Sequence, residues 1–134
     1  MLQLENKYDE LLIKESGCGN IIGVRNAIDN GANINAVDEE GNTALITVTM
    51  LGLDKPINEN EDYIEVIKLL LLNNADINKQ NDEKYTAITY ACMYNHPKMV
   101  KLLFENMSIQ NNDIKTGMVF ACYYGNLEII TILM

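Results

Sequence analysis

The chain has 134 residues, the length of one domain, and its 19 acidic and 10 basic side chains give a formal net charge of −9. This negative charge argues against a surface for nucleic acids or anionic lipids, and the 48% hydrophobic content argues against disorder. No apolar run, Leu69–Leu72 included, is long enough to cross a bilayer, and the acidic start is unlike a secretory signal. We therefore expect one intracellular domain, residues 1–134, whose 3 cysteines form no disulfide framework.

The first expected unit covers approximately residues 8–37 and contains two short helices followed by a connector. Asn20 suits the N-cap of the second helix, because its side chain can bond to unpaired backbone N–H groups. Gly31 suits the left-handed residue that ends that helix. The segment after it, GANINAVDEEGNT, is rich in turn residues and predicts the connector.

The second unit, approximately residues 38–80, repeats this order. NADINKQNDEKYTAITYA, residues 74–91, aligns with GANINAVDEEGNTALITV, residues 31–48, and Asn74 takes the place of Gly31. In DYIEVIKLLLLNN the residues Ile64, Ile67 and Leu70 recur at helical spacing. LDKPINENEDY, residues 53–63, looks inserted between the two helices and predicts an exposed loop.

The third and fourth units cover approximately residues 81–110 and 111–134. Pro97 and Asn126 suit the starts of their second helices. Residues 107–115 predict a shorter connector, because Met107 stands where the earlier units have Gly31 and Asn74. The chain ends inside an apolar helical pattern. Either the array continues in a longer protein, or a partner or another copy covers this end.

At this point the chain resembles the ankyrin repeat family. The resemblance rests on Gly41, Thr43 and Leu45, on the run Glu65–Leu71, and on Ala75–Asn78, with partial matches in the other units from about residue 11 onward. It implies an all-α solenoid of about four stacked helix-turn-helix units joined by β-turn connectors. The first unit is similar to a capping copy and the last is truncated.

No motif for catalysis, cofactor binding or metal binding is visible. His96, the only histidine, stands beside Pro97 and is expected to start a helix rather than to act as a base. Cys92 and Cys122 occupy equivalent positions and are expected in the core, and Cys18 lies in a Gly-rich turn. We therefore expect no enzyme activity, no cofactor and no metal.

The resemblance implies a protein-binding surface along the concave face, formed by the connector tips and the exposed sides of the first helices. Carried over by position, this surface contains Glu39, Glu40, Asn42, Met50, Leu51, Asp82, Glu83, Tyr85, Met93, Tyr94, Tyr123 and Tyr124. Leu51 and Tyr124 have packing against the neighbouring unit as an alternative. The acidic tips favour a partner of basic or mixed charge.

Two interpretations of function follow from the resemblance. The first is a scaffold that binds a partner protein segment and touches neither nucleic acid nor membrane. The second is a structural or self-associating part of a larger multidomain protein, with contact through the uncapped C-terminal end. Abundant Asn and Ile are typical of A+T-rich genomes, so a microbial effector secreted into a host cell and acting on host proteins stays open.

Overall fold

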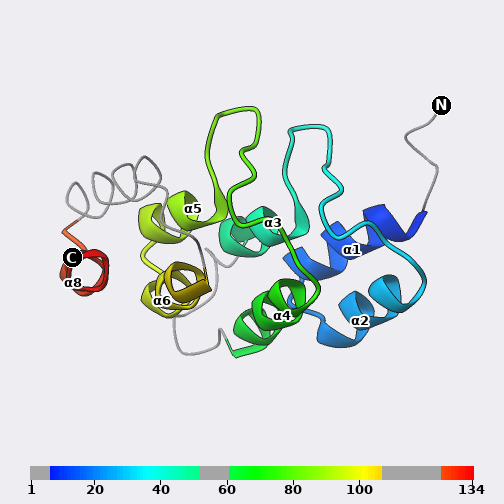
Figure 1. Cartoon of the computed structure of the whole chain (residues 1–134), viewed down its shortest axis with the longest axis horizontal. Helices are drawn as coiled ribbons and strands as arrows, with labels where there is room; N and C mark the ends of the chain where they lie inside the picture. Colours follow the sequence, from blue (N-terminus) through cyan, green and yellow to red (C-terminus); the bar gives the residue numbers. More distant parts are fainter. Residues whose placement is uncertain (1–6, 52–60, 107–124) are drawn as a thin grey trace.

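The computed structural model describes residues 7–51, 61–106 and 125–134, and these residues form seven helices (Figure 1). The helices are α1 (Lys7–Gly17), α2 (Ile21–Asp29), α3 (Ala44–Leu51), α4 (Glu61–Leu72), α5 (Ala87–Met93), α6 (Pro97–Asn106) and α8 (Leu127–Leu133). Within the described ranges there is no β-strand, only an isolated antiparallel bridge between Val37 and Thr43. The predicted all-α class is confirmed.

The helices form two parallel rows, which Figure 1 shows one above the other. In the first row α1 packs on α3 and α3 packs on α5, and in the second row α2, α4, α6 and α8 follow one another. Contacts between α1 and α2, α3 and α4, and α5 and α6 join the rows within each unit. This is the stacked solenoid that the repeat predicts, because a single short helix pair cannot bury its own apolar face.

The local signals for helix ends are confirmed. Asn20 is the N-cap of α2, where its side-chain oxygen accepts a hydrogen bond of 3.2 Å from the Gly23 N–H. Pro97 is the first residue of α6, and Asn126 precedes α8. Gly31 and Asn74 have φ values of +88° and +65°, so both occupy the left-handed position expected at the end of a unit.

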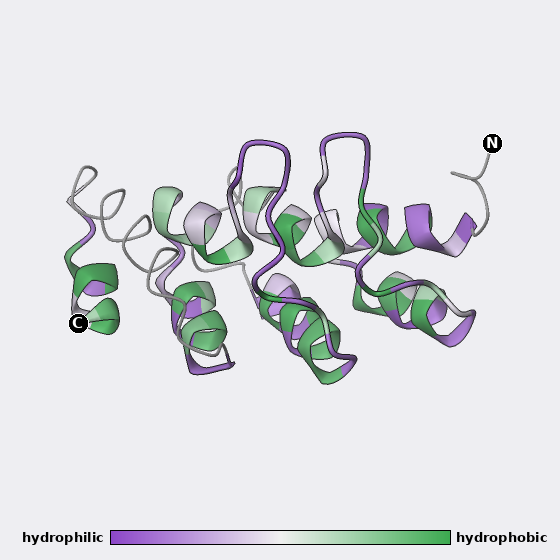
Figure 2. Cartoon of the chain, turned by 45° about the horizontal axis from the view of Figure 1, so that its top comes forward, coloured by the Kyte–Doolittle hydropathy of each residue, from purple (hydrophilic) through white to green (hydrophobic). Residues whose placement is uncertain are grey.

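The core is one continuous cluster to which both rows contribute. It includes Leu12 from α1, Ile67 and Leu70 from α4, and Leu103 from α6, all with essentially no exposed surface. Figure 2 shows apolar residues on α3 and on the helices of the second row, below two connector loops that are mostly hydrophilic, whereas α1 is largely hydrophilic outside its buried face. Each unit therefore depends on its neighbours for burial, and damage to one contact between units weakens the whole array.

Helix α3 lies at the centre of the first row and carries no charged residue. It contacts α1, α4 and α5, and its residues Ala44 to Thr49 are buried. The hydroxyl of Thr47 donates to the carbonyl of Thr43 at 2.9 Å, and that of Thr49 donates to the carbonyl of Ile46 at 2.7 Å. These bonds let two polar residues occupy the interior, because burial without a partner costs free energy.

The start of α4 corrects part of the predicted loop. Residues 53–63 were expected to be an exposed loop, but α4 already begins at Glu61, and Tyr63 is buried with 6% exposure. The Tyr63 ring packs against Gly19 of the first unit, where an added Cβ would lie 3.2 Å from ring carbon Cε1. Tyr63 is part of the core because it is buried against another unit. The polarity of its neighbours in the sequence does not reveal this burial. The remaining residues of the expected loop, 53–60, lie outside the described residues.

Several other expectations also fall outside the described residues. They are the shorter connector at 107–115 and the positions of Cys122, Tyr123 and Tyr124. Cys92 is fully buried, as expected of a core cysteine. None of the helices described has the length and apolar character needed to cross a membrane.

Candidate functional site

Two connectors rise beside the first row of helices and carry half of the predicted binding residues (Figure 1). The first connector, residues 30–43, joins α2 to α3, and the second connector, residues 73–86, joins α4 to α5. Each turns back on itself through a backbone hydrogen bond of 3.0 Å. In the first connector the Asp38 N–H donates to the Asn42 carbonyl, and in the second the Asn81 N–H donates to the Tyr85 carbonyl.

The two turns have the same internal geometry. Asp38 Oδ1 accepts hydrogen bonds from the N–H groups of Glu40 and Asn42, both at 2.9 Å. At the equivalent position Asn81 Oδ1 accepts from the N–H groups of Glu83 and Tyr85 at 3.0 and 3.1 Å. Asp and Asn side chains stabilise turns in this way because their oxygen lies close to the backbone two residues on.

Hydrogen bonds also tie the tips of the two connectors to each other. The Asp82 N–H donates to the Glu40 carbonyl at 3.0 Å, and Asn81 Nδ2 donates to Asn42 Oδ1 at 2.9 Å. The Asn81 amide donates as well to the hydroxyl of Tyr90 on α5 at 2.8 Å. Asn81 therefore joins three parts of the structure by hydrogen bonds: its own turn, the first connector and helix α5.

The bases of the connectors are joined by a second set of bonds between units. The Asp76 N–H donates to Asn35 Oδ1 at 2.7 Å, and the Asn33 N–H donates to Asp9 Oδ1 on α1 at the same distance. The first connector is thus fixed on both sides, by α1 and by the second connector. Surface side chains on it are presented from a firmly held backbone, which lowers the conformational cost of binding.

Asn42 departs from the expectation for a connector tip. Its side chain is only 4% exposed and bonds to Asn81 and, at 3.3 Å, to Asp38 Oδ2. Asn81, which is 5% exposed, was missed in the sequence. The alignment of Asn81 with Asp38 could have predicted its role, because the side chains of both residues can accept hydrogen bonds from the N–H groups of a turn.

Three tyrosines form a connected aromatic group at the second connector. The Tyr85 and Tyr90 rings meet edge to face at 5.5 Å, and the Tyr90 and Tyr94 rings stack at 6.0 Å with an angle of 12°. Tyr90 is buried, whereas Tyr85 and Tyr94 are half-buried and reach the surface. Such rings combine an apolar body with a polar tip, a combination that is enriched at protein interfaces.

The other predicted binding residues divide into two groups. The acidic residues at the connector tips are exposed, and these are Glu39, Glu40, Asp82 and Glu83. Met50 and Met93, in the last turns of α3 and α5, are half-buried. The side chain of Leu51 and the positions of Tyr123 and Tyr124 lie outside what the structure describes.

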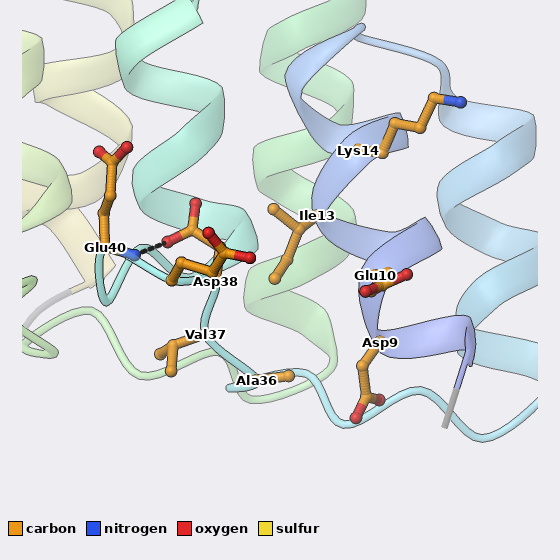
Figure 3. Close-up of a pocket in the computed structure, with 9 residues that line it drawn as sticks. Asp9, Glu10, Ile13, Lys14, Ala36, Val37, Asp38 and Glu40 are labelled. Carbon is orange, nitrogen blue, oxygen red and sulfur yellow. Dashed lines mark hydrogen bonds between the residues drawn. The ribbon is translucent and has the colours of Figure 1, made fainter. Parts of the chain in front are cut away.

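A groove of about 590 Å³ lies between α1 and the first connector, and its α1 side was not predicted from the sequence. Figure 3 shows Glu10 and Ile13 of α1 on one side of the groove and Val37, Asp38 and Glu40 of the connector on the other. Its lining consists of Asp9, Glu10, Ile13, Lys14, Ala36, Val37, Asp38, Glu39 and Glu40. No local pattern marks the α1 residues, because they meet the connector only after the units stack.

The nucleophilic and titratable side chains outside this surface are dispersed. Cys18 is exposed, while burial raises the pKa of the Cys92 thiol to about 12. His96 is 4% exposed, and neither ring nitrogen has a hydrogen-bond partner among the described residues. Within the same residues no group of three or more His, Cys, Asp or Glu side chains is placed to hold a metal ion.

Burial lowers the pKa of His96, which predicts a pH dependence of stability. Below about pH 6.5 the unfolded chain takes up a proton on this histidine while the folded chain stays neutral, so unfolding becomes easier as the pH falls. We expect a slope of up to about 1.4 kcal/mol per pH unit in this window. Urea unfolding of the wild type and of His96→Asn between pH 5 and pH 7 measures it. Equal slopes in the two proteins would contradict the prediction, because the chain has no other histidine.

Comparison with known proteins adds one positive finding. A family model described as ankyrin repeats, in three copies, matches residues 57–134, which is more than half of the chain. The matched range contains α4, α5, α6 and α8. A search of curated proteins gave no match.

Proposed function

The chain belongs to the ankyrin repeat family, whose repeats are generally protein–protein interaction modules and typically non-enzymatic, and from this premise we propose that it is a scaffold without catalytic activity. It binds a segment of a partner protein along the face formed by α1, α3, α5 and the two connectors. The partner segment is basic or mixed in charge, and neither nucleic acid nor membrane is involved. An intracellular location is part of the proposal and agrees with the free thiols of Cys18 and Cys92.

The observation that carries this proposal is the pairing of the two connectors. Because hydrogen bonds of 3.0 Å between Glu40 and Asp82 and of 2.9 Å between Asn42 and Asn81 join them, their tips form one continuous surface. The exposed acidic residues of both tips lie on this surface. Acidic groups around an interface raise the association rate with a basic partner more than they raise the affinity.

The aromatic side of the surface is expected to supply the affinity. Tyr94 stacks on the buried Tyr90, so its ring is held in place before a partner arrives. Ordered aromatic side chains lose little conformational entropy on binding and are frequent at interface hot spots. Met50 and Met93 can adapt to the shape of a partner, because the methionine side chain is flexible and unbranched.

Replacement of Tyr94 by alanine is expected to weaken binding of a partner segment by more than ~1 kcal/mol, about fivefold in Kd. The probe is a peptide selected on the immobilised chain from a random displayed library, and calorimetry measures its affinity. Ile22→Ala is the matched control, because Ile22 is an apolar residue with 78% exposure on α2 of the opposite row. Thermal unfolding of both variants verifies that the fold is intact. Selected peptides that bind Tyr94→Ala as tightly as the wild type would remove this surface from the proposal.

The second candidate is a structural or self-associating part of a larger protein, including an effector that acts on host proteins. It is favoured by exposed apolar residues at both ends of the last helix, since Leu127 at its start is 75% exposed and Met134, which follows it, is 91% exposed. Sedimentation velocity, which measures the oligomeric state, distinguishes the two candidate functions. Dimers that Leu127→Glu dissociates support self-association, whereas a monomer with peptide affinity at Tyr94 supports the scaffold.

A further inference from the structure

We propose that the groove between α1 and the first connector binds an arginine side chain, with its flanking apolar residues, from an extended segment of the partner protein. This rests on the proposed function and identifies the chemistry that one end of the binding surface recognises. The groove has a volume of about 590 Å³, within the range of about 300–1,000 Å³ that is usual for ligand sites. It is therefore large enough to receive more than one side chain.

The floor of the groove is apolar. Ile13 of α1 and Ala36 of the connector are half-buried, and Val37 is 47% exposed. At the position equivalent to Val37 the second connector has Gln80. Exposed apolar surface of this kind gains free energy when a partner covers it, so the floor suits an aliphatic stem or a neighbouring apolar side chain.

The rim of the groove is strongly negative. Five carboxylates line it, from Asp9, Glu10, Asp38, Glu39 and Glu40, against a single ammonium group from Lys14. Backbone N–H groups hold two of these carboxylates in place, since Asp9 accepts from Asn33 and Asp38 accepts from Glu40. No hydrogen bond or ion pair within the described residues engages the side chains of the three glutamates. These are the groups available to a cationic ligand.

The second connector does not share this character. It carries Lys79 and Lys84 beside Asp82 and Glu83, and the face of α3 below it contributes no charge. The negative potential is therefore concentrated at the α1 end of the binding surface. A partner segment is oriented by this asymmetry, with its basic residue directed to the groove.

Arginine fits the groove better than the other cationic ligands. The carboxylates do not converge as metal ligands do, because no set of three or more in the described residues could hold a metal ion. A guanidinium is planar, weakly hydrated and able to bond two carboxylates at once, and its aliphatic stem can lie on Ile13 and Val37. An ammonium group is a more strongly hydrated point charge and gains less from a partly apolar site.

The test uses the full chain and a defined peptide, acetyl-Ala-Leu-Arg-Leu-Arg-Ala-Ala-amide, in NMR titrations that follow backbone amide shifts. The matched peptide has citrulline, the neutral isostere, in place of both arginines. We expect shifts in residues 9–14 and 36–40 with the arginine peptide and about tenfold weaker binding of the citrulline peptide. The arginine peptide should also bind more weakly at about 300 mM salt than at about 50 mM.

Two double variants locate the site. Glu10→Gln with Glu39→Gln is expected to weaken arginine-peptide binding about fivefold, and Glu105→Gln with Glu128→Gln, on α6 and α8 of the second row, less than about twofold. All four residues are exposed, so these substitutions leave the fold intact. Equal binding of the citrulline peptide, equal loss in both double variants, shifts confined to the second connector, or no binding would each overturn the inference. If a library-selected peptide still depends on Tyr94, the proposed function stands although the arginine site has failed.

Discussion

Replacement of Asn81 by alanine is expected to lower the free energy of unfolding by about 2–4 kcal/mol, one of the largest effects of any polar substitution in this chain. Its buried amide makes four hydrogen bonds, two as a donor to Asn42 and Tyr90 and two as an acceptor from the turn N–H groups. Each such bond contributes about 0.5–1.5 kcal/mol, and a buried group left without its partner costs about 1–3 kcal/mol more. Asn42 Oδ1 would become such a group.

Asp38→Ala is the matched control for Asn81→Ala. Asp38 has the same two bonds to turn N–H groups, but it is exposed, and it lies in the first connector rather than between two units. Water can replace its bonds, so we expect a loss of only about 1 kcal/mol. Urea unfolding followed by circular dichroism measures both variants. Equal losses would mean that the bonds of Asn81 to Asn42 and Tyr90 contribute nothing beyond the turn.

Gly41→Ala is expected to cost about 2–4 kcal/mol, because it separates the two connectors as well as straining the backbone. Gly41 has a φ of +80°, where a residue with a Cβ is disfavoured. The added Cβ would lie 2.7 Å from Asp82 Oδ1, 3.0 Å from the Asp82 backbone nitrogen and 3.3 Å from Asn81 Cα. The carboxylate can rotate away, but the backbone of the second connector has to move.

Gly31→Ala separates the backbone strain of a positive φ from the clash with the second connector. Gly31 has a φ of +88°, almost the same as Gly41, but an added Cβ at Gly31 would meet no atom within 4 Å. Only the backbone penalty of about 1 kcal/mol therefore applies. The difference between the two variants in thermal or urea unfolding measures the close packing of the connectors. No difference would show that the second connector moves aside without cost.

The same two variants bear on the binding surface. If the connectors act as one unit, Gly41→Ala should also weaken a peptide that contacts both tips, whereas Gly31→Ala should leave its affinity unchanged. The reason is that the bond from the Asp82 N–H to the Glu40 carbonyl, one residue before Gly41, joins the two acidic tips. Loss of that bond adds an ordering cost to binding.

Several helix boundaries, though not the start of α4, were available from the sequence, because the interactions that set them are local. Asn20 caps α2 through a bond to a residue three positions later, Pro97 has the backbone angle of a first helical residue, and Gly31 and Asn74 accept a left-handed φ. The alignment of residues 31–48 with 74–91 added the order of the units. The all-α repeat architecture followed from these signals together.

The details of the binding surface depended on contacts between units, which the sequence does not specify. Asn42 looked like an exposed tip, but Asn81, 39 positions later, covers it. Tyr63 looked like part of a loop, but it packs on Gly19. A residue's exposure depends on what lies across from it, and that neighbour is set by how the units stack.

The groove between α1 and the first connector shows most clearly which features the sequence determines and which depend on packing between units. The sequence by itself determined that the first connector is acidic and rich in turn residues, because composition and turn preference are properties of adjacent residues. Only the tertiary structure placed Glu10 and Ile13 of α1 opposite Val37 and enclosed a volume between them. The physical reason is that a cavity needs two walls, and here packing between α1 and the connector brings together residues more than twenty positions apart.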